Sequence, residues 1–194
     1  MIRNWILLFG IVAVFATAMV GLTILPKMVV DERAEAPDYA NTFEIVKGHE
    51  IYVREGCIYC HSQQVRPQGF GADFDRGWGR ASEAEDYRQL TPHNLGTMRT
   101  GPDLSNIGER QPSEDWHLIN LYQPRALNDH TIMPPFPWLF EVISENARPN
   151  EEGLQLPERY RIPGKKVVPT EEAKYLVAYL LSLDQNPPGV EVEN

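Results

Sequence analysis

The most constraining feature of the chain is residues 5–25, WILLFGIVAVFATAMVGLTIL, a run without a charged side chain. A helix of this length would span about 30 Å, the thickness of the hydrocarbon part of a bilayer. The sequence therefore predicts one transmembrane helix with membrane lipid around residues 5–25, within an anchor that covers residues 1–27. Small residues recur on one helical face, as they do where membrane helices pack closely: Gly10, Ala13, Thr17 and Gly21.

The charges beside this run predict its orientation. Arg3 and the N-terminal amine precede it, whereas a mixture of basic and acidic residues follows from Lys27 onward. The positive-inside rule then favours a cytoplasmic N-terminus and places the rest of the chain outside. A cleaved signal peptide is the alternative, because residues 16–18 resemble a small-residue cleavage site. Against cleavage, the apolar run continues beyond that site to Leu25.

The remainder of the chain has the composition of one folded domain. Hydrophobic residues make up 42% of the sequence and charged residues 23%, values typical of globular proteins. Residues 28–41 are charged, contain Pro37 and show no periodicity, so they are predicted to be a linker before a domain over residues 42–194. The net charge of −9 argues against a nucleic-acid partner, because phosphate binding needs clustered Lys and Arg.

The first predicted helix of the domain runs from about residue 42 to Arg54, where Gly56 would end it. Its apolar residues fall on one side. Gly48 has no side chain that would hold a crossing helix away. We therefore expect a second helix to be able to approach at Gly48.

Two further helices are predicted. Residues 114–122 form the second, with Ser113 as its cap. The third begins at Thr170 and ends before Pro187, and one apolar stripe runs along it: Ala173, Leu176, Val177, Leu180 and Leu183. No alternating strand pattern is present. The predicted fold class is therefore all-α with long loops, preceded by one N-terminal transmembrane helix.

The residues Cys57-Ile58-Tyr59-Cys60-His61 form a Cys-x-x-Cys-His motif. On one helical turn, the two thiols can add to the two haem vinyl groups, and the following imidazole can ligate the iron. A redox dithiol would follow a strand in a βαβ pattern, and a zinc site would need two further Cys or His nearby; neither pattern is found. The motif therefore predicts one covalently attached haem c, bound by Cys57, Cys60 and His61.

The second axial ligand must come from elsewhere in the domain. The candidates are Met98, Met133, His49, His93, His117 and His130. A thioether is favoured because Met/His ligation raises the reduction potential and suits a carrier that feeds a strong oxidant. Met133 is the predicted iron ligand because Pro134 and Pro135 stiffen its loop. Met98 or a histidine is the alternative.

The segment Thr100-Gly101-Pro102-Asp103-Leu104, followed by Gly108-Glu109-Arg110, resembles a stretch of class I cytochromes c. This resemblance implies a class I cytochrome c fold for the domain. It also implies that the carbonyl of Pro102 accepts a hydrogen bond from His61 and fixes the tautomer of its ring.

More narrowly, the chain resembles the mono-haem cytochrome c subunit, subunit II, of cbb3-type haem-copper oxidases. The resemblance is carried by residues 51–52, 56–57, 60–63, 66–67, 99–104, 132–134 and 137–139. It implies a single-pass protein of the bacterial inner membrane with a periplasmic haem domain and Met133 as axial ligand. Electrons would pass to the catalytic haem-copper subunit, from a further cytochrome c subunit or a soluble cytochrome. The chain itself would perform no bond-making chemistry.

Several features leave alternatives open. Residues 141–168 depart from the family pattern. The haem c subunit of nitric oxide reductases has a similar anchor and haem motif, but the residues that flank them resemble this chain less. A free-standing membrane-anchored carrier is a further alternative. A haem sensor with an open iron site is another. Residues 64–97 are too long for an idle connection and could form a docking surface or cover the haem. Four arginines are candidate propionate partners: Arg66, Arg99, Arg110 and Arg125.

Overall fold

The computed structural model describes residues 2–33, 42–87, 92–96 and 98–185. The chain divides into two compact units. One contains the N-terminal helix together with residues 83–87. The other contains the remaining described residues, and with them every predicted site residue.

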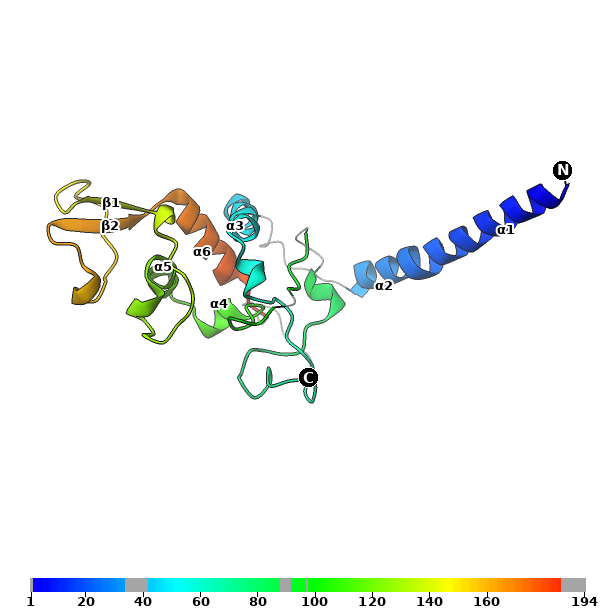
Figure 1. Cartoon of the computed structure of the whole chain (residues 1–194), viewed down its shortest axis with the longest axis horizontal. Coiled ribbons are helices and arrows are strands. Elements are labelled where there is room, and N and C mark those ends of the chain that lie inside the picture. The colour runs from blue at the N-terminus through cyan, green and yellow to red at the C-terminus, as the bar shows by residue number, and fades with distance from the viewer. Residues whose placement is uncertain (1, 34–41, 88–91, 97, 186–194) are drawn as a thin grey trace. The chain divides into compact units, whose positions relative to one another are not determined.

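The N-terminal helix is continuous and contains one widened turn. It consists of α1 (Ile2–Met19), the π-helical turn η1 (Val20–Ile24) and α2 (Leu25–Arg33), which follow one another without a break (Figure 1). Residues Asn4–Val29 include an 18-residue stretch with a mean hydropathy of 2.4, so the helix is long and apolar enough to cross a membrane. The helix contains the predicted span. It also takes in residues 28–33 of the predicted linker, whereas residues 34–41 lie outside the described residues.

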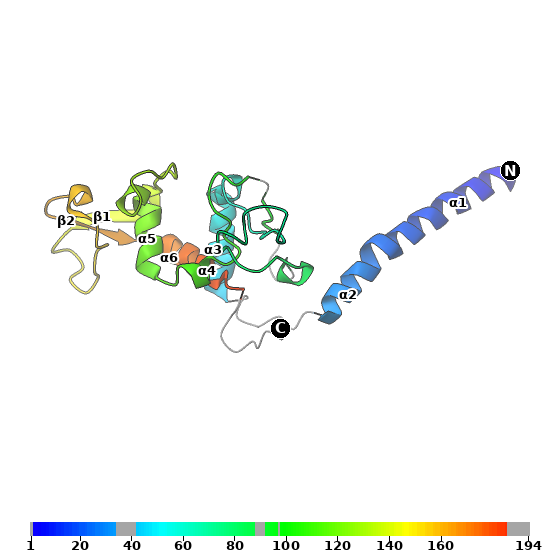
Figure 2. The ribbon, with the colours of Figure 1, turned by 90° about the horizontal axis from the view of Figure 1, so that it is seen from below.

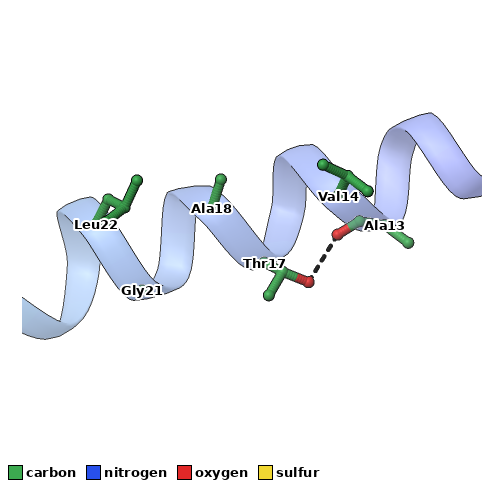
Figure 3. Close-up of a pocket in the computed structure, with 6 residues that line it drawn as sticks. All are labelled: Ala13, Val14, Thr17, Ala18, Gly21 and Leu22. Atoms are coloured by element: carbon green, nitrogen blue, oxygen red, sulfur yellow. Dashed lines mark hydrogen bonds between the residues drawn. The ribbon is translucent and has the colours of Figure 1, made fainter.

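The widened turn has a cause in the sequence. The N–H of Leu25 bonds to the carbonyl of Val20, one residue further back than in an α-helix. Pro26 follows, and proline has no N–H and collides with the preceding turn of a regular helix. A single π-helical turn before Pro26 relieves that collision. A shallow hollow along the helix is lined by the residues that Figure 3 labels: Ala13, Val14, Thr17, Ala18, Gly21 and Leu22.

All three helices predicted for the domain are confirmed. They are α3 (Phe43–Arg54), α5 (Glu114–Tyr122) and α6 (Glu171–Ser182), with the short α4 (Ile107–Arg110) between the first two. The Ser113 hydroxyl caps α5 by accepting a hydrogen bond from the N–H of Trp116, and Thr170 caps α6 by accepting one from Ala173. The stripe on α6 is buried from Ala173 to Leu180, while Leu183 is the half-buried residue at the end of the helix.

The centre of the domain is the crossing of α3 and α6, which lie side by side in Figures 1 and 2. A Cβ atom placed on Gly48 would lie 2.0 Å from the carbonyl oxygen of Tyr175, so the two backbones meet there as expected. Tyr52 from α3 and Tyr179 from α6 pack edge to face beside the crossing, and both are buried. The predicted close approach at Gly48 is thus confirmed.

Short 3₁₀ turns interrupt the connections between these helices. They are η3 (Cys57–Tyr59), η4 (Ala84–Tyr87), η5 (Pro124–Ala126), η6 (Pro137–Leu139) and η7 (Glu158–Tyr160). Of these, η4 belongs to the N-terminal unit and the others to the domain.

The domain also contains a two-stranded antiparallel sheet, which corrects the all-α prediction. Strand β1 (Phe140–Ser144) pairs with β2 (Lys165–Pro169), in a register that sets Phe140 opposite Pro169 and Ser144 opposite Lys165. Along β1 only Phe140 is buried, so the sequence carries no alternation of buried and exposed residues. Both strands lie in or beside residues 141–168, the region that departs from the family pattern.

Candidate haem site

The Cys-x-x-Cys-His motif forms the turn that follows α3. Gly56 has a φ angle of 74°, a left-handed conformation that suits glycine, and it ends the helix as predicted. The turn η3 comes next, and the N–H of His61 donates to the carbonyl of Cys57 at 2.9 Å. One helical turn therefore carries Cys57, Cys60 and His61, as attachment of haem c requires.

Both cysteines are free thiols, with Cys57 half-buried and Cys60 exposed. Burial raises the pKa of the Cys57 thiol to about 12. A redox dithiol works through a thiol whose pKa is lowered, so this environment opposes the dithiol alternative. Within the described part of the chain no group of three or more His, Cys, Asp or Glu side chains could hold a metal ion, and the zinc alternative gains no support.

The His61 ring is oriented by a backbone carbonyl. Its Nδ1 lies 2.7 Å from the carbonyl oxygen of Pro102. A carbonyl can only accept, so Nδ1 carries the proton and Nε2 keeps its lone pair for a metal. Burial lowers the pKa of His61, which keeps the ring neutral near pH 7. The structure thus brings His61 and Pro102 into the contact that the resemblance implies, while their role toward haem stays a prediction.

Gly101 makes room for this ring. A Cβ atom at position 101 would lie 2.3 Å from Cε1 of His61, closer than any side chain can approach. The N–H of Gly101 also donates to the carbonyl of Cys60 at 2.9 Å. The segment that supplies the Pro102 carbonyl is therefore fixed directly against the motif turn.

A buried aspartate joins the same two segments. Asp103 is fully buried, and its carboxylate accepts hydrogen bonds from the Ser62 hydroxyl at 2.6 Å and from the N–H of Gln64 at 2.8 Å. A third bond comes from the N–H of Ser105 at 2.9 Å. Sequence reasoning missed this role, since nothing local marks Asp103 as the partner of residues about forty positions earlier.

A second buried network ties α6 to the motif. The hydroxyl of Tyr179 donates to the side-chain carbonyl of Gln63 at 3.0 Å, and Asn94 donates to that hydroxyl at 3.4 Å. Burial raises the pKa of Tyr179 to about 12, so the phenol stays neutral and keeps its proton for Gln63. The residues after His61 are thereby held from two sides.

Met133 lies in a loop whose backbone is hydrogen-bonded on both sides of it. Its own N–H donates to the Thr131 hydroxyl at 3.2 Å, and the N–H of Phe136 donates to the carbonyl of Leu121 at 2.8 Å. The side-chain amide of Asn120, on α5, donates to the Met133 sulfur at 3.5 Å. The sulfur is thus oriented by a residue that sequence reasoning did not single out.

Two of the rival histidines, like His61, have a ring nitrogen bonded to a backbone carbonyl. His49 and His117 are buried, and each uses a ring nitrogen on a backbone carbonyl, of Pro92 at 3.2 Å and Gln111 at 2.9 Å respectively. Burial lowers the pKa of both rings. Met133 stays the predicted second ligand, because its N–H is bonded to Thr131 and its sulfur is oriented by Asn120.

Two of the four candidate arginines have internal partners. Arg99 pairs with the buried carboxylate of Asp73 and donates to the carbonyl of Gln64, and Arg110 donates to the carbonyl of Asp103. The guanidinium of Arg99 also lies 5.5 Å from the centre of the buried Trp78 ring. The contacts of Arg99 fasten residues 64–78 to the segment that supplies the Pro102 carbonyl. Arg66 and Arg125 are exposed.

These residues fit a haem c. Two free thiols and an imidazole with an unprotonated Nε2 share one turn, and Gly101 leaves the space beside that imidazole open. The donors available, one imidazole nitrogen and one oriented thioether sulfur, are those of electron-carrying cytochromes c.

Comparison with known proteins gives an independent result. A search of curated proteins finds no match. The family model of the mono-haem subunit of cytochrome c oxidase (FixO) matches residues 1–154, well over half of the chain. The chain therefore belongs to this family of one-haem subunits of haem-copper oxidase complexes.

Proposed function

We propose that this chain carries one covalently attached haem c and passes electrons to the catalytic subunit of a haem-copper terminal oxidase. The contact between His61 and Pro102 supports this most directly, because it leaves Nε2 of a neutral ring, on the motif turn, to bind iron. Membership of the family supplies the single haem and the oxidase complex.

In this proposal the site residues hold the haem in two ways, through covalent bonds and through the iron. Cys57 and Cys60 bind the haem vinyl groups as thioethers, and His61 and Met133 bind the iron. The bound haem supplies one-electron redox chemistry. The chain orients the ligands: Pro102 fixes the ring of His61, and Asn120 directs the sulfur of Met133. It performs no bond-making step of its own.

The proposal includes a location and a donor. The N-terminal helix crosses the bacterial inner membrane once, with lipid around residues 5–25, a cytoplasmic N-terminus and a periplasmic haem domain. The flanking charges and the apolar span support this placement. The donor is a further cytochrome c subunit or a soluble cytochrome. An oxidase partner is favoured over a nitric oxide reductase by the family match.

Haem attachment is tested on the purified full chain. The denatured protein should keep one haem and weigh correspondingly more than its amino acids. The double variant Cys57→Ala/Cys60→Ala should lose this haem, whereas Ile58→Ala, which alters the same turn and spares both thiols, should keep it. A wild-type chain without haem after denaturation would overturn the proposal.

Partnership is tested by extraction from the native membrane with a mild detergent. The chain should migrate with a catalytic haem-copper subunit, and oxygen added to the reduced complex should oxidise its haem. Migration alone would support a free-standing carrier. Consumption of nitric oxide in place of oxygen would support the reductase alternative, and a ferrous spectrum changed by carbon monoxide would support a sensor with an open iron site.

A further inference from the structure

The turn η7 lies against the loop that leads to Met133. The Arg159 guanidinium binds the carboxylate of Asp129, and one of its nitrogens also donates to the carbonyl of Arg125 at 3.2 Å. The Tyr160 hydroxyl donates to the same carbonyl at 3.4 Å. Two consecutive side chains of η7 thus converge on residues 125–129.

These two side chains also support each other. The guanidinium carbon of Arg159 lies 4.9 Å from the centre of the Tyr160 ring, within the range of a cation–π contact. The ring therefore limits the rotamers that Arg159 can adopt. This lowers the entropic cost of holding the guanidinium against Asp129 and the Arg125 carbonyl.

The turn η7 is part of the lobe, by which we mean residues 145–164 between β1 and β2. This lobe is itself anchored to the core. Leu156, just before η7, is buried, and the side chain of Arg161, just after it, donates to the Leu156 carbonyl at 2.7 Å. The lobe continues into β2, which pairs with β1. At the base of that sheet, the N–H and hydroxyl of Thr170 donate to the carbonyl of Leu139 at 3.0 and 2.8 Å.

A series of local hydrogen bonds links residues 125–129 to Met133. Asn128 accepts from the N–H of His130 at 3.0 Å through its side chain and from the N–H of Thr131 at 3.1 Å through its carbonyl. The Thr131 hydroxyl then accepts from the N–H of Met133 at 3.2 Å. Because these hydrogen bonds follow one another along the chain, contacts that hold residues 125–129 in place also restrict the position of Met133.

We propose that Arg159 and Tyr160 are positioning residues that hold the 125–131 loop in place and so keep Met133 on the haem iron. The inference rests on the proposed function, in which Met133 is an iron ligand. A thioether is a weak ligand, so the fraction of molecules in which it is bound depends on the stability of its loop. Residues 158–160 lie outside the residues that the family model matches.

The test uses the purified full-length haem protein in its ferric state. Bound methionine gives a charge-transfer band near the red end of the spectrum, and added imidazole replaces the methionine and removes that band. An open loop binds imidazole more readily. Arg159→Ala should therefore raise the apparent affinity for imidazole about three- to tenfold, the range expected for one exposed ion pair with an extra hydrogen bond. Tyr160→Phe should have a smaller effect in the same direction.

The matched control is Arg148→Ala. Arg148 also lies between β1 and β2 and is similarly exposed, but its ion-pair partners are Glu141 and Glu151, which lie outside residues 125–133. Its imidazole affinity should equal that of the wild type. Equal affinities in wild type, Arg159→Ala and Tyr160→Phe would overturn the positioning role alone. A wild-type protein without the band would overturn Met133 as ligand, and the positioning role with it.

Discussion

The space beside the His61 ring is set by a single residue, Gly101. Because a Cβ atom there would lie 2.3 Å from the ring, Gly101→Ala must displace either the imidazole or the segment that supplies the Pro102 carbonyl. Overpacking of this kind costs about 1–3 kcal/mol. We expect the population with the His61–Pro102 contact to fall by about 5- to 150-fold, seen as a change from a low-spin to a mixed-spin haem spectrum.

Gly71→Ala is the control for this substitution. A Cβ at position 71 would meet its nearest atom at 3.5 Å, an ordinary contact, and this glycine does not have a positive φ angle. The Gly71→Ala spectrum should match the wild type. An unchanged low-spin spectrum in Gly101→Ala would contradict the view that the ring needs this space.

The second residue-scale prediction concerns the sulfur ligand. Met133→Ala removes the thioether that Asn120 orients, so the ferric band near the red end of the spectrum should disappear. Met98→Ala should leave the band in place, because Met98 is not the predicted ligand. Persistence of the band in Met133→Ala together with its loss in Met98→Ala would reverse the assignment.

At the scale of elements, the crossing of α3 and α6 depends on Gly48. Its Cβ would lie 2.0 Å from the Tyr175 carbonyl, and a backbone atom cannot move aside as a flexible side chain can. Gly48→Ala should therefore lower the free energy of unfolding by about 1–3 kcal/mol, measured by urea denaturation. Lys47→Ala, on the exposed side of the same helix, should change it by no more than about 0.5 kcal/mol. Similar losses in both variants would contradict a backbone-contact role for Gly48.

The elements differ in how far the sequence alone could predict them. The helices carry local signals: a capping hydroxyl at Ser113 or Thr170, and one apolar stripe on α6. The sheet carries none, because β1 and β2 pair across twenty residues of loop and bury one residue of β1. Among the site residues, the haem motif and Pro102 could be predicted from sequence patterns. The roles of Asn120 and Arg159 could not be predicted, because they come from contacts with other parts of the chain.

At the scale of the whole molecule, two buried histidines tie stability to pH. His49 on α3 and His117 on α5 each have a pKa lowered by burial, and each spends a ring nitrogen on a backbone carbonyl. In the unfolded chain the histidine pKa is the ordinary 6.5. Below that pH these two histidine rings bind protons more readily in the unfolded state than in the folded state. The stabilisation is therefore complete above pH 6.5 and is lost as the pH falls below it.

This loss can be isolated by comparing the wild type with His49→Gln/His117→Gln, in which an amide can still donate to each carbonyl and nothing titrates. Between pH 6.5 and 5.5 the wild type should lose up to about 1 kcal/mol of unfolding free energy per histidine more than the variant, measured by urea denaturation. His61 and the exposed histidines are common to both proteins, so their contributions cancel in the difference. Parallel stability curves would mean that these two rings are protonated as readily in the folded chain as in the unfolded one, which their burial at 4% and 2% exposure opposes.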